Sequence, residues 1–372
     1  MASLGSPTAA ANDPGAVSPD RSSGPPSLPA ALPARLNATA PGDVLGRVLS
    51  AVRLTGAVFF AVDASSPWCV DVPIARDYAA ILLPEAPHIL SYHIIVDGEG
   101  WAAVPGADPV RFGPGDIVVF PQGDAYRMES RPGTPPELDR GQTLDFFRAL
   151  SAGALPFVIP EGGGAEPRAR FICGFLGCEA RPFNPILASL PRMLHLSRPG
   201  AGGGDVLDRL IDLTMEEARA SRAGRSSVSL RLSELMFMEL LRQYAGSPAE
   251  KPPGWLAALG DAPVARALDA LHADPARDWS VADLGREAGL SRSALAARFA
   301  ARLGQPPLRY LTRWRMQLAA TALLDPARPL AAIAEEVGYS SETALSRSFK
   351  RETGLSPQAW RRARLETSSD RR

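Results

Sequence analysis

Side chains that can contact nucleic-acid bases gather in two segments near the C-terminus of the 372-residue chain. In each segment two apolar residues stand four apart, Leu295 with Phe299 and Leu345 with Phe349, as on the buried face of a helix. Positions around these anchors must then face outward. An outward arginine can form a bidentate hydrogen bond with guanine, and small side chains let a helix approach the base edges. The outward positions are Arg292, Ser293 and Ala296 in the first segment, and Glu342, Thr343, Ser346 and Arg347 in the second.

Cationic side chains in and between the same segments are suited to phosphate contacts that set the register on a duplex. The formal net charge of the chain is zero, yet residues 263–372 carry 18 Lys and Arg against 12 Asp and Glu, a net of +6. A basic end on a neutral protein suits a module that faces phosphate. For any one of these cations, a solvated helix face explains the charge equally well. The expected phosphate contacts are Arg298, Arg313, Lys350 and Arg351.

A tandem repeat positions these side chains. The eleven-residue segments that begin at Val281 and at Leu330 match at five positions with a constant offset of 49. After one inserted residue, five further positions match at an offset of 50. Each copy predicts a short amphipathic helix, a turn with glycine and a helix started by serine. This pattern is typical of a helix-turn-helix, here expected at 281–303 and 330–353. Residues 308–324 predict a connecting helix of about 25 Å, which would hold the two recognition helices about one turn of B-DNA apart.

The stretch from about Pro263 to Arg364 resembles the DNA-binding domain of the AraC/XylS transcriptional regulators. The resemblance is carried by the run from Leu284 to Leu295, by Gly304-Gln-Pro-Pro, by the run from Ile333 to Tyr339 and by Gly354-Leu-Ser-Pro. It implies a double helix-turn-helix domain that binds double-stranded promoter DNA, with RNA polymerase as a further contact. It also places Thr343 and Arg347 at base-reading positions.

The pattern of residues 57–175 is typical of β-strands. Short apolar runs at 58–62, 89–96, 101–104, 117–120 and 171–173 are separated by turn signals such as Asp97-Gly98 and Gly113-Pro-Gly. Many short strands indicate a small sandwich or barrel, with loops expected at 132–141 and 160–167. Residues 57–245 more loosely resemble the cupin-type sensor domain found in one branch of the same family. We therefore expect a multidomain α+β protein with an N-terminal cupin-like β-barrel, a helical dimerisation segment and an all-α domain.

The expected organisation has five parts. Residues 1–40 form an Ala/Pro-rich tail without enough apolar side chains to fold, and 41–246 form the sensor and dimerisation domain. A Pro-rich linker at 247–260 leads to the DNA-binding domain at 261–364, and 365–372 form a second tail. Within the sensor, apolar periodicity predicts helices at 205–222 and 227–244. Their surplus apolar residues either pack on the barrel or form the homodimer interface that the resemblance implies.

Two cysteines five residues apart, Cys173 and Cys178, are candidates for redox or effector chemistry. A Cys-x4-Cys pair can form a reversible disulfide if a turn brings the Cα atoms within about 7 Å. It can also supply two metal ligands if Cys69, His195 or a second subunit completes the set. The plain alternative is that both are small buried hydrophobes. No metal site is predicted.

The histidines disfavour a metal-using cupin enzyme. Such a site needs a His-x-His pair, a carboxylate and a later histidine, but the chain has four histidines, of which His88 and His93 are five apart. Tyr126 stands where the resemblance expects the later histidine. The side chains that either line a small-molecule pocket or fill the barrel core are Tyr92, His93, Trp101, Phe120 and Tyr126.

These patterns favour a DNA-binding transcription regulator whose barrel senses a small molecule or an oxidant. We expect no catalytic residues and no cofactor, because the sequence contains no phosphate-binding glycine loop, nucleophile elbow or metal-ligand cluster. We also expect neither a signal peptide nor a membrane span, and a cytoplasmic location. The first alternative is a cupin-like enzyme or binding protein fused to a DNA-binding domain. The second is an architectural DNA binder without a ligand.

Overall fold

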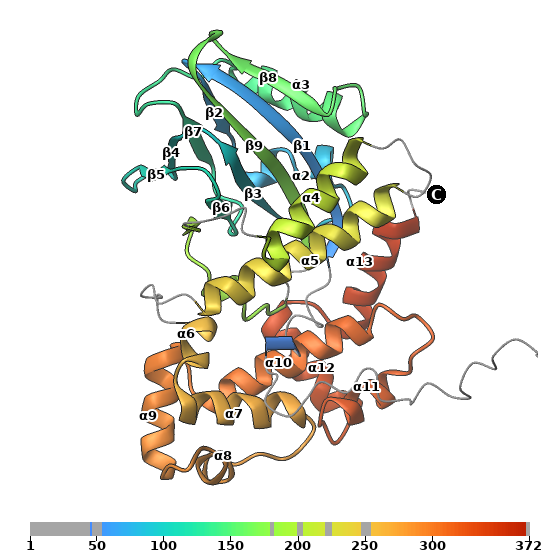
Figure 1. Cartoon of the computed structure of the whole chain (residues 1–372). Coiled ribbons are helices and arrows are strands. Elements are labelled where there is room, and N and C mark those ends of the chain that lie inside the picture. Colours follow the sequence, from blue (N-terminus) through green and yellow to red (C-terminus); the bar gives the residue numbers. More distant parts are fainter. Residues whose placement is uncertain are drawn as a thin grey trace, which may run out of the picture. The chain divides into compact units, whose positions relative to one another are not determined.

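The computed structural model describes residues 45–46, 54–178, 182–198, 204–219, 225–246 and 254–369, and Figure 1 shows the arrangement of its elements. The predicted N-terminal tail at 1–40 lies outside these residues. The final helix, α13 (Pro357–Ser369), continues into the segment expected to be the C-terminal tail. No helix among the described residues combines the length and the apolar character needed to cross a membrane.

The strands described in the N-terminal half form two sheets. The larger sheet has the order β10-β6-β3-β9-β1-β8 and the smaller has the order β2-β7-β4-β5. Their pairings are antiparallel except for β1 with β8, which is parallel. The bounds are β1 Leu54–Ser66, β2 Cys69–Val72, β3 His88–Asp97, β4 Gly100–Ala103, β5 Val110–Phe112, β6 Ile117–Phe120, β7 Tyr126–Glu129, β8 Val158–Gly162, β9 Ala165–Cys178 and β10 Leu194–Leu196.

The central strands β3 and β9 are buried on both faces. Side chains alternate along a strand, so Cys173 and its cross-strand partner His93 face the space between the sheets, whereas Tyr92 and Cys178 belong to the cluster on the outer face. Helices α4 (Val206–Arg219) and α5 (Arg225–Gly246) cover that outer face (Figure 1). Two-sided burial explains why these strands read as nearly continuous apolar runs in the sequence.

The strands predicted from the apolar runs and the predicted cupin-like fold are confirmed, and two details differ from the expectation. The two sheets face each other without closing into a barrel, although the arrangement is cupin-like. The loop expected at 160–167 is largely strand, because β8 ends at Gly162 and β9 begins at Ala165. Strand β8 was not predicted because Pro160 argues against a strand in the sequence. Proline is tolerated there because β8 is an edge strand.

The other expected loop, 132–141, ends in helix α3 (Arg140–Ser151). A capping box starts this helix: Asp139 accepts from the backbone N–H of Gln142, whose side chain accepts from the N–H of Asp139. Three short segments complete the described part of this half: the 3₁₀ helix η1 (Ala75–Asp77), α2 (Ala79–Leu82) and the 3₁₀ helix η2 (Leu187–Ser189).

The C-terminal half is helical and contains both helix-turn-helix motifs. The first is α8 with α9 and the second is α11 with α12, which confirms the repeat read from the sequence. Gly289, at φ +68°, and Gly338, at φ +77°, provide the left-handed turns between the paired helices. The bounds are α6 Trp255–Leu259, α7 Ala262–Ala273, α8 Val281–Ala288, α9 Arg292–Leu303, α10 Pro307–Ala322, α11 Leu330–Glu336 and α12 Glu342–Thr353.

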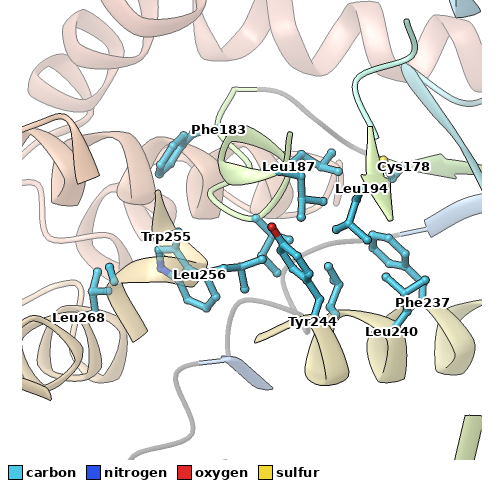
Figure 2. Close-up of a cluster of buried hydrophobic side chains, with 14 of the residues drawn as sticks. Cys178, Phe183, Leu187, Leu194, Phe237, Leu240, Tyr244, Trp255, Leu256 and Leu268 are labelled. Atoms are coloured by element: carbon cyan, nitrogen blue, oxygen red, sulfur yellow. The ribbon is translucent and has the colours of Figure 1, made fainter. Parts of the chain in front are cut away.

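Helix α6 occupies part of the stretch expected to be linker, and the linker residues 247–253 lie outside the described part of the chain. Trp255 and Leu256 of α6 are buried in the same apolar cluster as Phe183 and Leu187 of the sensor half and Leu268 of α7 (Figure 2). The apolar Trp-Leu pair makes this segment a packed element.

Candidate nucleic-acid interface

Helix α9 presents the first group of expected base contacts. Leu295 and Phe299 are fully buried, which fixes the outward face of the helix. Arg292 and Ser293 are exposed on that face and Ala296 is half-buried. The Ser291 side chain caps the helix by accepting from the backbone N–H of Ala294 at 3.2 Å.

Helix α12 repeats this arrangement with more polar chemistry. Leu345 and Phe349 are fully buried, and the Ser341 hydroxyl accepts from the N–H of Ala344 at 3.2 Å. Among the expected base contacts, Ser346 is half-buried and the exposed ones are Glu342, Thr343 and Arg347. Arg292, Arg347 and Lys350 form no ion pair with any residue that the structure describes, so their guanidinium and ammonium groups are available to an anionic partner.

Arg298 has a structural partner that the sequence did not reveal. Its Nε donates to both carboxylate oxygens of Asp261, at 2.9 and 2.8 Å, and Nε of Arg302 donates to the same carboxylate at 3.0 Å. Asp261 is the N-cap of α7 and is buried. Burial alone would raise the pKa of Asp261, but the hydrogen bonds from the two arginines hold it below its ordinary value. Arg298 therefore anchors α9 to the start of α7.

Arg313 is also engaged inside the protein. Its guanidinium lies over the ring of Phe183, 4.0 Å from the centroid, and burial lowers its pKa. Phe183 in turn meets the ring of Tyr310 edge-on at 5.6 Å, and its backbone N–H donates to Oε1 of Gln317 at 3.0 Å. Lys350 is exposed, whereas Arg351 lies beside Glu352 at 3.6 Å. Of the four expected phosphate contacts, Lys350 is the most freely presented.

A cavity of about 50 Å³ lies within the sensor half, and we call it the sensor cavity. Both sheets and helix α3 contribute to its walls. Two of the five side chains predicted for a pocket, His93 and Tyr126, line it, together with Cys173, whereas Phe120 is buried in the core. The cavity also has lining residues that the sequence did not predict for a pocket, among them Phe60, Cys69, Phe146, Phe147, Glu161 and Phe175.

His93 is the centre of a buried hydrogen-bond chain at this cavity. Its Nδ1 lies 3.0 Å from Sγ of Cys173 and its Nε2 lies 2.9 Å from the hydroxyl of Tyr126. Burial lowers the pKa of His93 to about 3, so the imidazole is neutral at physiological pH. A neutral ring donates from one nitrogen and accepts at the other, and here both are occupied. Burial also raises the pKa of the Cys173 thiol well above its ordinary value, so it is not a thiolate.

Glu161 adds an ionisable group to the cavity wall. Burial, reinforced by the charge of Glu137, raises the pKa of Glu161 to about 7. This carboxyl therefore exchanges its proton near neutral pH and can act as a hydrogen-bond donor or acceptor toward a ligand. No sequence pattern marked it, because the residue lies in the stretch expected to be a loop.

The remaining sensor candidates lie elsewhere. Tyr92 is on the outer face of the sheet, where its ring covers Gly174 so closely that a Cβ there would lie 2.0 Å from it. Trp101 is half-buried on β4 of the smaller sheet. Cys178 also lies on the outer face of the sheet, buried beneath the helices that cover it. Figure 2 shows its side chain near Leu194 and Phe237 in the same apolar cluster.

The turn that a Cys173–Cys178 disulfide requires is absent. Both residues belong to the continuous strand β9, on opposite faces, and five residues of extended chain span about 16 Å. All three cysteines are buried thiols. His195, the other possible metal ligand, lies 2.9 Å from the carboxylate of Asp116. No group of three or more His, Cys, Asp or Glu in the described ranges is placed to hold a metal ion.

Comparisons with known proteins agree with this organisation. Residues 43–246 match the family model described as Cupin, and residues 284–363 match one described as Helix-turn-helix domain. A "Putative AraC-like transcription regulator" of Streptomyces lividans is 36% identical over 283 residues, which cover 75% of this chain and 88% of that protein. The "HTH-type transcriptional regulator AlkR" of Acinetobacter baylyi is 26% identical over 86% of this chain and 99% of its own length.

The chain belongs to the AraC-like transcription regulators. This AraC-like regulator thus combines a cupin domain with a DNA-binding helix-turn-helix domain, as the resemblance implied. The relatives above are named as transcription regulators rather than enzymes.

Proposed function

We propose that this AraC-like regulator controls transcription in response to a small, largely apolar molecule bound in the sensor cavity. The observation that carries the proposal is the cavity itself, which is enclosed by two sheets and by α3 and is walled mainly by aromatic and aliphatic side chains. Largely apolar walls with a few placed polar groups are typical of small-molecule sites.

The polar groups indicate what the ligand must offer. His93 and Tyr126 hold each other through a buried hydrogen bond at one wall, and Glu161 lies at another. Because Glu161 has a pKa of about 7, a hydroxyl, carbonyl or amine on the ligand can be satisfied there at physiological pH. A permanently charged group would be desolvated without a fixed counter-charge, which is costly.

Oxidation of Cys173 is a second candidate, favoured by the position of its sulfur on the cavity wall. A hydroperoxide would transfer one oxygen atom to Sγ, giving a sulfenic acid and leaving as water or an alcohol. The raised pKa of the thiol opposes this reaction, because the thiolate is the nucleophile. We therefore rank it second.

On the DNA side we propose that α9 and α12 read two parts of one promoter site, as a homodimer that also contacts RNA polymerase. Apolar side chains on α4 and α5 support the homodimer. Val206 and Leu213 on α4, and Val228 and Leu235 on α5, are exposed and stand seven residues apart, so each pair forms a stripe on one helix face. A second copy of the chain would bury these stripes.

One experiment separates the two signals. Cys173→Ser keeps the cavity volume and removes the sulfur, whereas Cys173→Met fills the cavity. DNA fragments enriched from a genomic library by the purified protein provide the binding assay, with phenol and hydrogen peroxide as probes. Small-molecule sensing predicts that phenol raises the melting temperature and shifts DNA affinity in wild type and Cys173→Ser but not in Cys173→Met. Oxidant sensing predicts that peroxide acts on wild type alone. Failure of both probes on wild type would reject both assignments.

A further inference from the structure

The two helix-turn-helix motifs are built on separate hydrophobic cores. Trp314 of α10 belongs to the apolar cluster that contains the core of the first motif and continues into the sensor half, and Met316, two residues later, belongs to the core of the second motif. The two cores touch at the half-buried Leu318. The two cores are therefore joined through α10, and contacts between the loops of the two motifs can add to this helix in fixing the angle between them.

Arg315 lies between Trp314 and Met316 and makes those contacts. Toward the first motif it donates to three carbonyls of the α7–α8 loop, from Nε to Pro275 at 2.7 Å and from Nη2 to Ala276 at 3.4 Å and Arg277 at 2.8 Å. Toward the second motif its Nη1 donates to the carbonyl of Gly338, in the turn between α11 and α12, at 3.2 Å.

The loop and the turn that Arg315 joins also touch each other directly. A Cβ at Gly338 would lie 2.3 Å from the carbonyl oxygen of Ala276 and 2.7 Å from its Cα. Glycine is therefore needed at this position for the close approach as well as for its φ of +77°. The side chain of the next residue, Tyr339, lies with its ring centroid 5.7 Å from the Arg315 guanidinium.

We propose that Arg315 is a positioning residue that fixes the angle between the two helix-turn-helix motifs, and thereby the spacing between the two DNA half-sites that the regulator accepts. This inference rests on the proposed reading of one site by both motifs. Its chemistry is specific to arginine, because a planar guanidinium has five donors in a fixed fork. A lysine ammonium at the same place keeps the charge but is a point donor on a flexible stem.

The first test uses full-length protein and selection from random DNA. Wild type is expected to enrich two half-sites at one narrow spacing. Arg315→Lys and Arg315→Met are expected to retain both half-site sequences but accept spacings one or two base pairs longer or shorter, with roughly tenfold weaker binding at the wild-type spacing. Binding to a fragment with a single half-site should stay within about twofold of wild type. Arg286→Lys is the matched control, since Arg286 pairs only with Asp283 of its own helix among the described residues.

An unchanged spacing distribution in both Arg315 variants would overturn the inference. An equal loss at the single half-site would also overturn it, because Arg315 would then merely stabilise the domain. If wild type itself enriched an undivided site, the proposed two-part reading would fail instead, so the two failures are distinguishable.

A second measurement does not depend on DNA. Spin labels on Arg292→Cys and Arg347→Cys report the distance between the two recognition helices, and the native cysteines are buried. We expect a narrow distance distribution with Arg315 and a clearly broader one with Arg315→Lys. Equal widths would contradict the proposal.

Discussion

At the scale of single residues, the two recognition helices differ in the chemistry that they present. Among the expected base contacts, helix α9 presents Arg292 beside small side chains, whereas α12 presents Glu342, Thr343 and Arg347. The buried anchors were predictable because their spacing repeats along the helix. The partners of Arg298 and Arg313 were not, because Asp261 and Phe183 are 37 and 130 residues away in sequence and no local pattern relates them.

Arg347→Ala should weaken specific binding by about 1–3 kcal/mol and relax the preference at one base position, without changing the melting temperature. Lys350→Ala is the contrasting control. It should weaken binding to all sequences alike and lower the slope of log affinity against log salt by about one. Gel shifts at several salt concentrations measure both, and a uniform loss for Arg347→Ala would remove it from the base contacts.

The pH dependence of stability should reveal the carboxyl of Glu161. Its pKa is about 7 in the folded protein and about 4.3 in an unfolded chain. Between these values the unfolded state binds fewer protons than the folded state, so the free energy of unfolding falls as pH rises from about 4.5 to 7 and is flat above. In Glu161→Gln, the free energy of unfolding should fall by about 1–3 kcal/mol less than in wild type over this pH range. Parallel wild-type and variant curves from urea melts would show that Glu161 does not titrate in this way.

At the scale of elements, local signals determined how well each one was predicted. Helices α8 to α12 carry their own periodicity and turn glycines, so the sequence alone located them. Helix α3 and strand β8 have weaker patterns: α3 follows a run rich in proline and glycine, and β8 contains Pro160. The cavity wall is built partly from these two missed elements, which is why Phe146, Phe147 and Glu161 escaped prediction.

The junction between α7 and α9 depends on the ionised carboxylate of Asp261. Asp261→Asn should lower the free energy of unfolding at pH 7 by roughly 1–3 kcal/mol, because one cap is weakened and two arginines lose their counter-charge. The pKa of Asp261 is depressed in the folded state, so this contribution is present above about pH 4 and is lost as pH falls through the lower folded value. Wild-type and variant stabilities should converge in chemical melts once the pH falls below the lowered pKa of Asp261. A constant gap would point to a cause other than the ion pairs.

At the scale of the whole molecule, the sensor half and the DNA-binding half meet at Phe183. Strand β9 carries Cys173 at the cavity, and Phe183 follows the end of this strand by five residues. Its ring packs against Tyr310 and beneath Arg313, on the helix that connects the two helix-turn-helix motifs. A ligand that displaces β9 would therefore act on α10 through a short stretch of chain. No local pattern predicts this contact, because Phe183 and Arg313 are 130 residues apart in sequence.

Loss of the contact between the Arg313 guanidinium and the Phe183 ring should then have a measurable effect on DNA affinity. If the guanidinium is a phosphate contact that Phe183 withholds, Phe183→Ala should strengthen DNA binding several-fold and raise the salt slope by about one. Arg313→Ala in the wild-type background should change affinity little, and the double variant should lose the gain, since the two residues act through one contact. Equal gains with and without Arg313 would show instead that Phe183 restrains the domain as a whole. A loss of binding in Phe183→Ala would mean that the contact supports the DNA-binding conformation.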